Sequence, residues 1–165
     1  MQIFPKHIHL RYYYIGVGIY VLFTLIIIML SSGGLGIKMF SNKTNSMSPT
    51  ITTGSLIFVR PSTQYTVGDI ITFYSGIERK NEIRTHRVYQ IGGNVYITKG
   101  DNNITYDSEV VTPQGVIGKV IYIVPFLGYV FQFIKSTVGV IFVILLPAIA
   151  IITIEILRII KATSR

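Results

Sequence analysis

Two side chains in this sequence could form the centre of a hydroxyl-based catalytic site. Ser46 lies in the segment Asn45–Thr50 (Asn-Ser-Met-Ser-Pro-Thr), where Pro49 fixes its own φ and disfavours a helix just before it. A serine hydroxyl is a weak nucleophile, so it needs a base to take its proton and a third group to orient that base. The middle of the chain offers one histidine for this work, His86. By itself the segment is also an ordinary turn composition.

Carboxylates that could orient a histidine follow His86 in the chain. Asp101 stands in the run Lys99–Asn103 (Lys-Gly-Asp-Asn-Asn), which is typical of a turn, and Asp107 and Glu109 come shortly after it. The spacing permits a serine, a histidine and an aspartate to meet in a folded domain. It does not decide which aspartate would meet the histidine.

The composition favours a membrane protein over a nucleic-acid-binding protein. Of 165 residues, 50% are hydrophobic and only 13% are charged. The net charge of +8 is scattered, without a run of basic residues or a zinc-finger pattern. The sequence has 0 cysteines, which excludes a thiol nucleophile, a disulfide framework and a cysteine-ligated metal site. We expect no cofactor, no metal and no nucleic-acid partner.

Two long apolar segments predict membrane spans at either end of the chain. Residues 12–37 carry no charge and follow Lys6 and Arg11, which predicts a signal anchor after a tail of residues 1–11. A cleavable signal peptide is the competing interpretation of this segment. Residues 136–157 predict a second span, followed by a basic tail of residues 158–165. The positive-inside rule then predicts that both termini are cytoplasmic and that residues 38–135 lie on the extracytoplasmic or lumenal side.

The segment between the spans predicts a mostly β domain. Short β-branched and aromatic runs bounded by glycine and proline recur along it, and Gly92-Gly93-Asn94 is typical of a hairpin turn. The predicted strands are residues 55–59, 69–74, 82–89, 95–98 and 116–124. The fold class predicted here is therefore an extracytoplasmic β domain flanked by two transmembrane α-helices.

Four ordered motifs resemble the conserved boxes of type I signal peptidases. These are Asn45–Thr50, Val67–Ile71 (Val-Gly-Asp-Ile-Ile), Thr85–Val88 (Thr-His-Arg-Val) and Lys99–Asn103. The resemblance covers about residues 40 to 130 and includes a closing segment of residues 115–128. A histidine before Arg-Val, where the common bacterial type has lysine, resembles the endoplasmic-reticulum and archaeal type, which is also found in some Gram-positive bacteria.

The resemblance implies an integral membrane serine endopeptidase that removes signal peptides from exported preproteins, and it assigns roles to individual residues. Ser46 would be the nucleophile, and His86 the general base and later the general acid. Asp107 would orient His86, and Asp101 would be a second carboxylate supporting the site. The backbone N–H of Ser46 and the hydroxyl of Thr44 would form the oxyanion hole.

Substrate-binding residues are expected on two stretches that lead into the nucleophile and the base. An extended peptide that pairs with a strand edge presents alternate side chains to one face, which matches small residues one and three positions before a cut. The partners expected are signal peptides, the lipid bilayer, and a secretion translocon or peptidase complex. The membrane would be the plasma membrane or the endoplasmic reticulum. The substrate-binding residues expected are Lys43, Asn45, Met47, Ile83, Arg84 and Thr85.

Two other classes of protein compete with this interpretation. A membrane-anchored β-domain that serves only as a scaffold or complex subunit would need no catalytic triad. An aspartyl membrane protease would use Asp101 and Asp107 instead of Ser46. Replacing Ser46 with alanine distinguishes these classes, because only the serine peptidase should lose cleavage.

Overall fold

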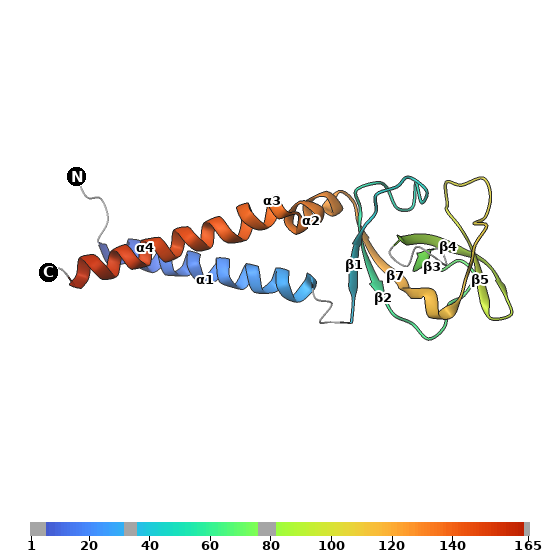
Figure 1. The fold of residues 1–165 in the computed structure, drawn as a ribbon, viewed down its shortest axis with the longest axis horizontal. Coiled ribbons are helices and arrows are strands. Elements are labelled where there is room, and N and C mark those ends of the chain that lie inside the picture. The colour runs from blue at the N-terminus through green and yellow to red at the C-terminus, as the bar shows by residue number, and fades with distance from the viewer. Residues whose placement is uncertain (1–5, 32–35, 76–81, 164–165) are drawn as a thin grey trace. The chain divides into compact units, whose positions relative to one another are not determined.

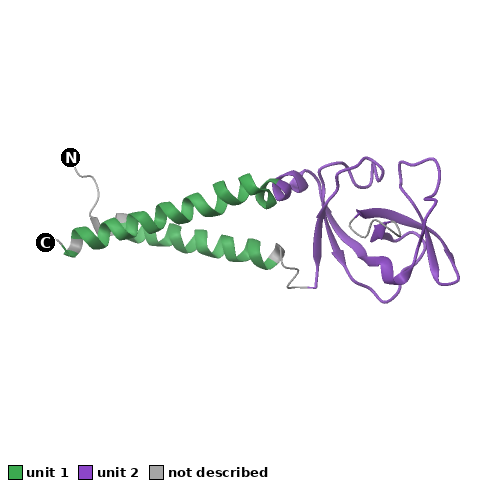
Figure 2. Ribbon diagram, in the orientation of Figure 1, with its two compact units in different colours: residues 1–32, 133–165 green, residues 33–132 purple. Residues whose placement is uncertain are grey.

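The computed structural model describes residues 6–31, 36–75 and 82–163. They form two compact units, residues 33–132 and the two terminal segments 1–32 and 133–165 (Figure 2). Residues 33–132 form the predicted β-domain, and the two terminal segments form a helical unit (Figure 1).

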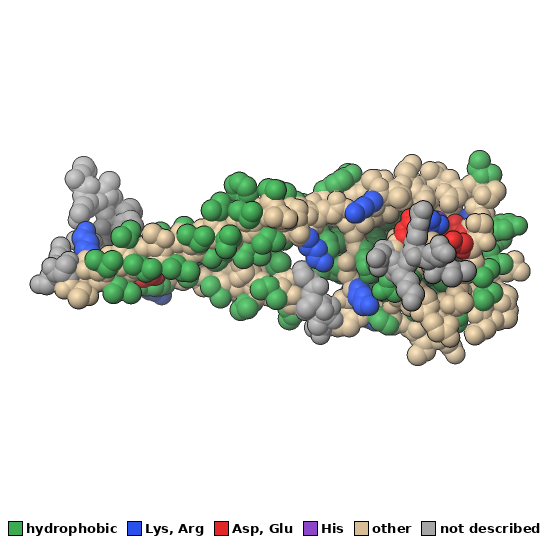
Figure 3. Space-filling model, in the orientation of Figure 1, with side chains coloured by type: hydrophobic (Ala, Val, Ile, Leu, Met, Phe, Trp, Pro, Cys, Tyr) green, Lys and Arg blue, Asp and Glu red, His purple; other side chains and the backbone are tan. Residues whose placement is uncertain are grey.

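The helical unit holds one helix from each end of the chain. Helix α1 covers Lys6–Ser31, and the C-terminal helix is continuous through α3 (Thr137–Gly139), the π-helical η2 (Val140–Leu145) and α4 (Leu146–Thr163). Leu10–Met29 and Thr137–Lys161 are long and apolar enough to cross a membrane. Hydrophobic side chains cover much of the visible face of both helices (Figure 3).

The helix bounds differ from the predicted spans. Helix α1 starts at Lys6, six residues before the predicted anchor of residues 12–37, and residues 32–35 of that anchor lie outside the described residues. Helix α4 continues to Thr163, beyond the predicted end at residue 157. The polar ends of both helices continue the backbone hydrogen bonding of the apolar centre, which hydropathy alone does not register. Of the predicted tails, residues 1–5 and 164–165 also lie outside the described residues.

Pro147 alters the C-terminal helix within its apolar segment. Proline has no N–H to offer the carbonyl four residues earlier, which here belongs to Val143. The helix widens to the π form just before Pro147, and the Tyr20 hydroxyl donates to the Ile144 carbonyl at 2.6 Å. The same hydroxyl lies 3.4 Å from the Val143 carbonyl. Helix α1 therefore supplies a donor at the point where the proline removes one.

Seven antiparallel strands form one sheet in the β-domain, in the order β1-β2-β7-β3-β4-β5-β6. This confirms the predicted β-domain between two long apolar helices. A 3₁₀ turn, η1 (Pro113–Gly115), precedes β7, and helix α2 (Leu127–Lys135) follows it. The strands are β1 (Lys38–Ser41), β2 (Leu56–Arg60), β3 (Ile70–Ser75), β4 (Glu82–Gly92), β5 (Val95–Lys99), β6 (Val110–Val111) and β7 (Val116–Val124).

The sheet buries two apolar clusters that support different parts of the site. One cluster contains Met47 and Ile51 from the segment after β1, packed against β2 and β7. The other contains Ile71, Phe73 and Val88, from the strands around His86. Each cluster thus fixes the backbone next to one of the chemically active side chains.

Candidate active site

Ser46 is held on a loop that is closed at its base and anchored in the core. The Asn42 N–H donates to the Ser55 carbonyl at 2.9 Å, and the Gly54 N–H donates to the Asn42 carbonyl at 2.8 Å. Met47, the residue after Ser46, is 0% exposed. Ser46 itself is half-buried, so its hydroxyl can be reached from solvent.

Asn45 and Ser48, on either side of Ser46 and Met47, stabilise the turn by hydrogen bonds to each other. The Ser48 N–H donates to the Asn45 carbonyl at 3.1 Å, and the Ser48 hydroxyl donates to the Asn45 side-chain oxygen. The Asn102 N–H donates to the Ser46 carbonyl at 2.8 Å, which ties the Ser46 segment to the turn after β5. Within the described residues the Ser46 N–H has no hydrogen-bond acceptor, so it is available to a ligand.

His86 lies between Ser46 and Asp107 and is hydrogen-bonded to both. His86 lies on β4 opposite Ile71 of β3, and it is 6% exposed, with the Phe73 ring edge-on at 6.4 Å. Its Nε2 is 3.1 Å from the Ser46 Oγ, and its Nδ1 is 2.6 Å from Asp107 Oδ2. Hydroxyl, imidazole and carboxylate therefore stand in the order that serine hydrolases use.

Asp107 is fixed by more than the histidine. Its N–H donates to the Thr98 carbonyl at 2.8 Å, and the Thr98 hydroxyl donates to Oδ2 at 2.6 Å. Burial alone would raise the pKa of Asp107, but the hydrogen bonds from His86 and Thr98 outweigh it and leave the pKa below its ordinary value. Asp107 is therefore ionised at neutral pH and favours the imidazole tautomer with its proton on Nδ1.

Asp101 has a different partner. Its two oxygens accept from Arg87 Nε at 2.8 Å and Nη2 at 2.6 Å, and Arg87 Nη1 donates to the Gly68 carbonyl at 2.8 Å. The Arg87 contact is the main reason that the pKa of Asp101 is lowered, with burial acting in the opposite direction. Asp101 thus joins β4 to the turn that binds the Ser46 carbonyl, and it is Asp107 that contacts His86.

The residues expected to bind substrate fall into two groups. Lys43, Thr44 and Asn45 are exposed, and the Thr44 Oγ lies 3.1 Å from the Ser46 Oγ. Met47 corrects the expectation: its side chain lies in the core cluster with Ile51 and so offers no surface to a peptide. Met47 was expected at the surface because it is next to Ser46, but burying its apolar side chain in the core is more favourable.

The second group lies on a free strand edge. Strand β4 pairs with β3 from Glu82 to Arg87, but with β5 only from Arg87 onward. Between residues 82 and 86, the side of β4 away from β3 has no strand partner in the described part of the chain. Ile83 and Arg84 are exposed there, and Thr85 is half-buried with its hydroxyl 2.9 Å from that of Thr72.

Three residues of the site were not predicted from the sequence. Thr98 orients Asp107, Arg87 binds Asp101, and Asn102 binds the Ser46 carbonyl through its backbone. The sequence did offer a signal that Thr98 faces the interior: in an alternating strand it lies on the same face of β5 as the aromatic Tyr96. In the described residues no three histidine, aspartate or glutamate side chains gather as metal ligands.

The domain is an antiparallel β-sheet structure in which a serine, a histidine and an aspartate are hydrogen-bonded in the order known from serine peptidases. The chain belongs to the peptidase S24-like family, whose model matches residues 31–121. It is also 36% identical over 114 residues to signal peptidase I W of Bacillus subtilis (strain 168). That match covers 58% of this chain and spans 58% of the length of the curated relative.

Proposed function

We propose that this protein is a membrane-anchored serine endopeptidase that removes N-terminal signal peptides from exported preproteins. The observation that carries the proposal is the continuous hydrogen-bonded chain from Ser46 through His86 to Asp107. Membership in a peptidase family and similarity to a signal peptidase support it, as do the two apolar helices that could cross a membrane. The histidine base favours the endoplasmic-reticulum and archaeal type.

In the proposed reaction, His86 Nε2 accepts the Ser46 proton as the Ser46 Oγ attacks the scissile carbonyl carbon. The carbonyl oxygen becomes an oxyanion, which the free Ser46 N–H and the Thr44 hydroxyl stabilise by donating to it. Protonated His86 then gives its proton to the leaving amine, and the C–N bond breaks to leave an acyl-enzyme on Ser46. Asp107 stabilises the imidazolium that forms in between.

Hydrolysis of the acyl-enzyme repeats these roles with water. His86 takes a proton from the water as its oxygen attacks the ester carbon, and later returns the proton to the Ser46 Oγ. The signal peptide leaves with a new carboxyl group, and the site is restored. Asp101 acts indirectly in this scheme, because its pair with Arg87 fixes the turn whose Asn102 N–H holds the Ser46 carbonyl.

The substrate would bind as an added strand on the free edge of β4. Backbone groups of Ile83 to Thr85 on that edge can pair with an extended peptide, with Lys43 to Asn45 on its other side. Side chains two residues apart on such a peptide point to the same face, which suits small residues one and three positions before the cut. The β-domain would work outside the cytoplasm with both chain termini inside, alone or with a translocon or peptidase complex.

The proposal is tested by cleavage of a model preprotein by purified protein in detergent. Mass spectrometry of the products should find one cut after a small-x-small sequence. A substrate with a bulky residue directly before the cut should be spared, since its side chain would not fit. Cleavage at unrelated sites would contradict the proposal. So would the absence of cleavage with either substrate, which is the result expected for a scaffold subunit.

A further inference from the structure

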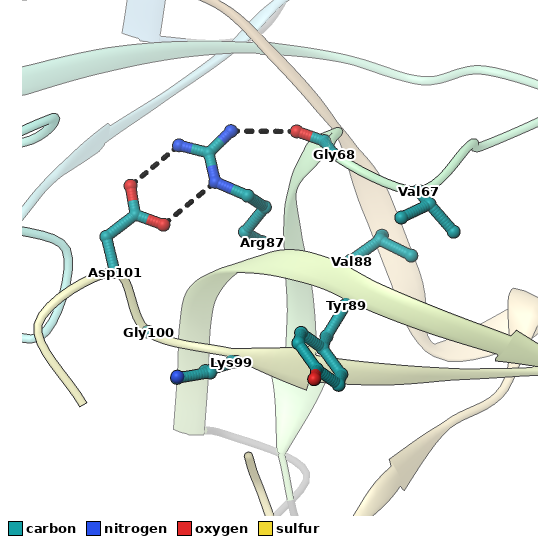
Figure 4. Close-up of a pocket in the computed structure, with 8 residues that line it drawn as sticks. All are labelled: Val67, Gly68, Arg87, Val88, Tyr89, Lys99, Gly100 and Asp101. Atoms are coloured by element: carbon teal, nitrogen blue, oxygen red, sulfur yellow. Dashed lines mark hydrogen bonds and ion pairs between the residues drawn. The ribbon is translucent and has the colours of Figure 1, made fainter. Parts of the chain in front are cut away.

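A cavity of about 360 Å³ lies on the β-domain close to the candidate nucleophile. Its lining comes from three segments: the turn at Val67 and Gly68, the part of β4 that follows His86, and the end of β5 with the turn after it (Figure 4). The proposed reaction uses the pair of Arg87 and Asp101 in its lining only as support for the site, and it places no substrate group in the cavity. The lining residues are Val67, Gly68, Arg87, Val88, Tyr89, Lys99, Gly100 and Asp101.

One wall of the cavity is in direct contact with the nucleophile segment. A Cβ atom on Gly100 would lie 2.6 Å from the Ser46 carbonyl oxygen, so only glycine allows this approach. The Asn102 N–H of the same turn donates to that oxygen at 2.8 Å. A peptide bound at Ser46 thus has the cavity within reach of a few extended residues, each of which spans about 3.3 Å.

Of the two cationic side chains that line the cavity, Arg87 has a carboxylate partner and Lys99 has none among the described residues. Arg87 is paired with Asp101 through two hydrogen bonds, and its Nη1 also donates to the Gly68 carbonyl (Figure 4). Lys99 makes no ion pair with any described residue, and its ammonium group lies 6.0 Å from the centre of the Tyr89 ring. Val67 and Val88 supply apolar walls. A short side chain that ends in a carboxylate is complementary to this arrangement.

The order of residues along β4 indicates which part of a substrate would reach the cavity. The free edge at Ile83 to Thr85 precedes His86, whereas the lining residues Arg87 to Tyr89 follow it. If residues before the cut pair with that edge, the residues after the cut continue toward the cavity. We propose that the cavity binds the first residues of the mature chain, and that Lys99 selects an acidic side chain there. This inference rests on the proposed function.

The test uses model preproteins that differ at a single position. Glutamate or glutamine is placed at each of the first four positions after the cut, and kcat/KM is measured in uncharged detergent. At one or more positions the wild type should prefer glutamate about three- to fivefold, as expected for a partly exposed charge pair, and added salt should reduce the preference. Lys99→Gln should abolish the preference, so that the ratio of kcat/KM for the two substrates approaches one, and Lys99→Arg should keep it. Lys38→Gln removes an exposed lysine on β1 and should keep it too.

The following outcomes would overturn the inference. The inference is wrong if the wild type cleaves all substrates equally, or if the preference survives in Lys99→Gln. A lipid phosphate would be the occupant if Lys99→Gln changed rates only with anionic vesicles of phosphatidylglycerol, and equally for both side chains. If the wild type cleaves no preprotein at all, the proposed function itself fails and the inference fails with it.

Discussion

Replacing Asp107 with asparagine tests the assignment of the two aspartates. Asp107 Oδ2 is 2.6 Å from His86 Nδ1, and both side chains are shielded, with 13% of Asp107 and 8% of His86 exposed. Because little solvent screens this contact, loss of the charge should raise the barrier for forming an imidazolium. By analogy with other triads, we expect kcat/KM to fall on the order of 10⁴-fold, or about 5 kcal/mol in activation free energy.

Asp101→Asn is the matched control for this experiment. It removes the same charge from a carboxylate that binds Arg87 and makes no hydrogen bond to His86 in the described structure. We expect a loss of about 1.5–3 kcal/mol in the free energy of unfolding, the value for hydrogen bonds to a charged group. The turnover of each folded molecule should stay within about tenfold of wild type.

The assay combines single-turnover cleavage of a model preprotein with thermal unfolding of each variant. Thermal unfolding separates lost catalysis from lost folding, which a rate alone cannot do. The reasoning is refuted if Asp107→Asn turns over at a near-normal rate. It is also refuted if Asp101→Asn is well folded but inactive, because the two roles would then be reversed.

Three further predictions concern Thr98, the pair of Asp101 with Arg87, and the membrane topology. Thr98→Val keeps the shape of a buried side chain but removes the donor to Asp107, so kcat should fall about tenfold with KM little changed, measured on the same preprotein. An unchanged kcat would contradict the orienting role of Thr98. The pKa of Asp101 is lowered in the folded state, so its pair with Arg87 stabilises the fold above the ordinary aspartate pKa of about 3.9, and this stability is lost as the pH falls through the folded pKa. Urea midpoints of wild type and Asp101→Asn should therefore differ at pH 6 and converge at acid pH; a constant difference would be evidence against this linkage. A cysteine placed at exposed Ser62 should react with an impermeant reagent from outside the membrane, and one at position 163 only after permeabilisation. Labelling of both from the same side would contradict the proposed topology.

The sequence predicted the larger elements because their signals are local. Five of the seven strands are runs of β-branched and aromatic residues, and both apolar helices follow from length and hydropathy. Strands β1 and β6 were missed, since four and two residues are too short for an alternating pattern to stand out. The π-helical segment before Pro147 also depends on geometry that hydropathy does not encode.

The candidate site was accessible to sequence reasoning only in part. Residue types and spacing allowed Ser46, His86 and either aspartate to meet, and the resemblance to a family was needed to prefer Asp107. Two contacts distinguish the roles of the aspartates: Thr98 donates to Asp107, and Arg87 donates to Asp101. Each of them joins a strand to the loop after β5. Such pairings are set by strand register and by the path of a loop. Spacing along the chain does not specify either.

The most direct test of the central claim compares Ser46→Ala with Ser48→Ala in cleavage of one model preprotein. Both variants remove a hydroxyl from the same short segment, but only Ser46 lies 3.1 Å from His86 Nε2, whereas Ser48 donates to Asn45. We predict that Ser46→Ala lowers kcat on the order of 10⁶-fold, the loss known for the nucleophile of a serine peptidase, and that Ser48→Ala stays within about tenfold of wild type. Retained cleavage by well-folded Ser46→Ala would contradict the assignment of Ser46 as the nucleophile.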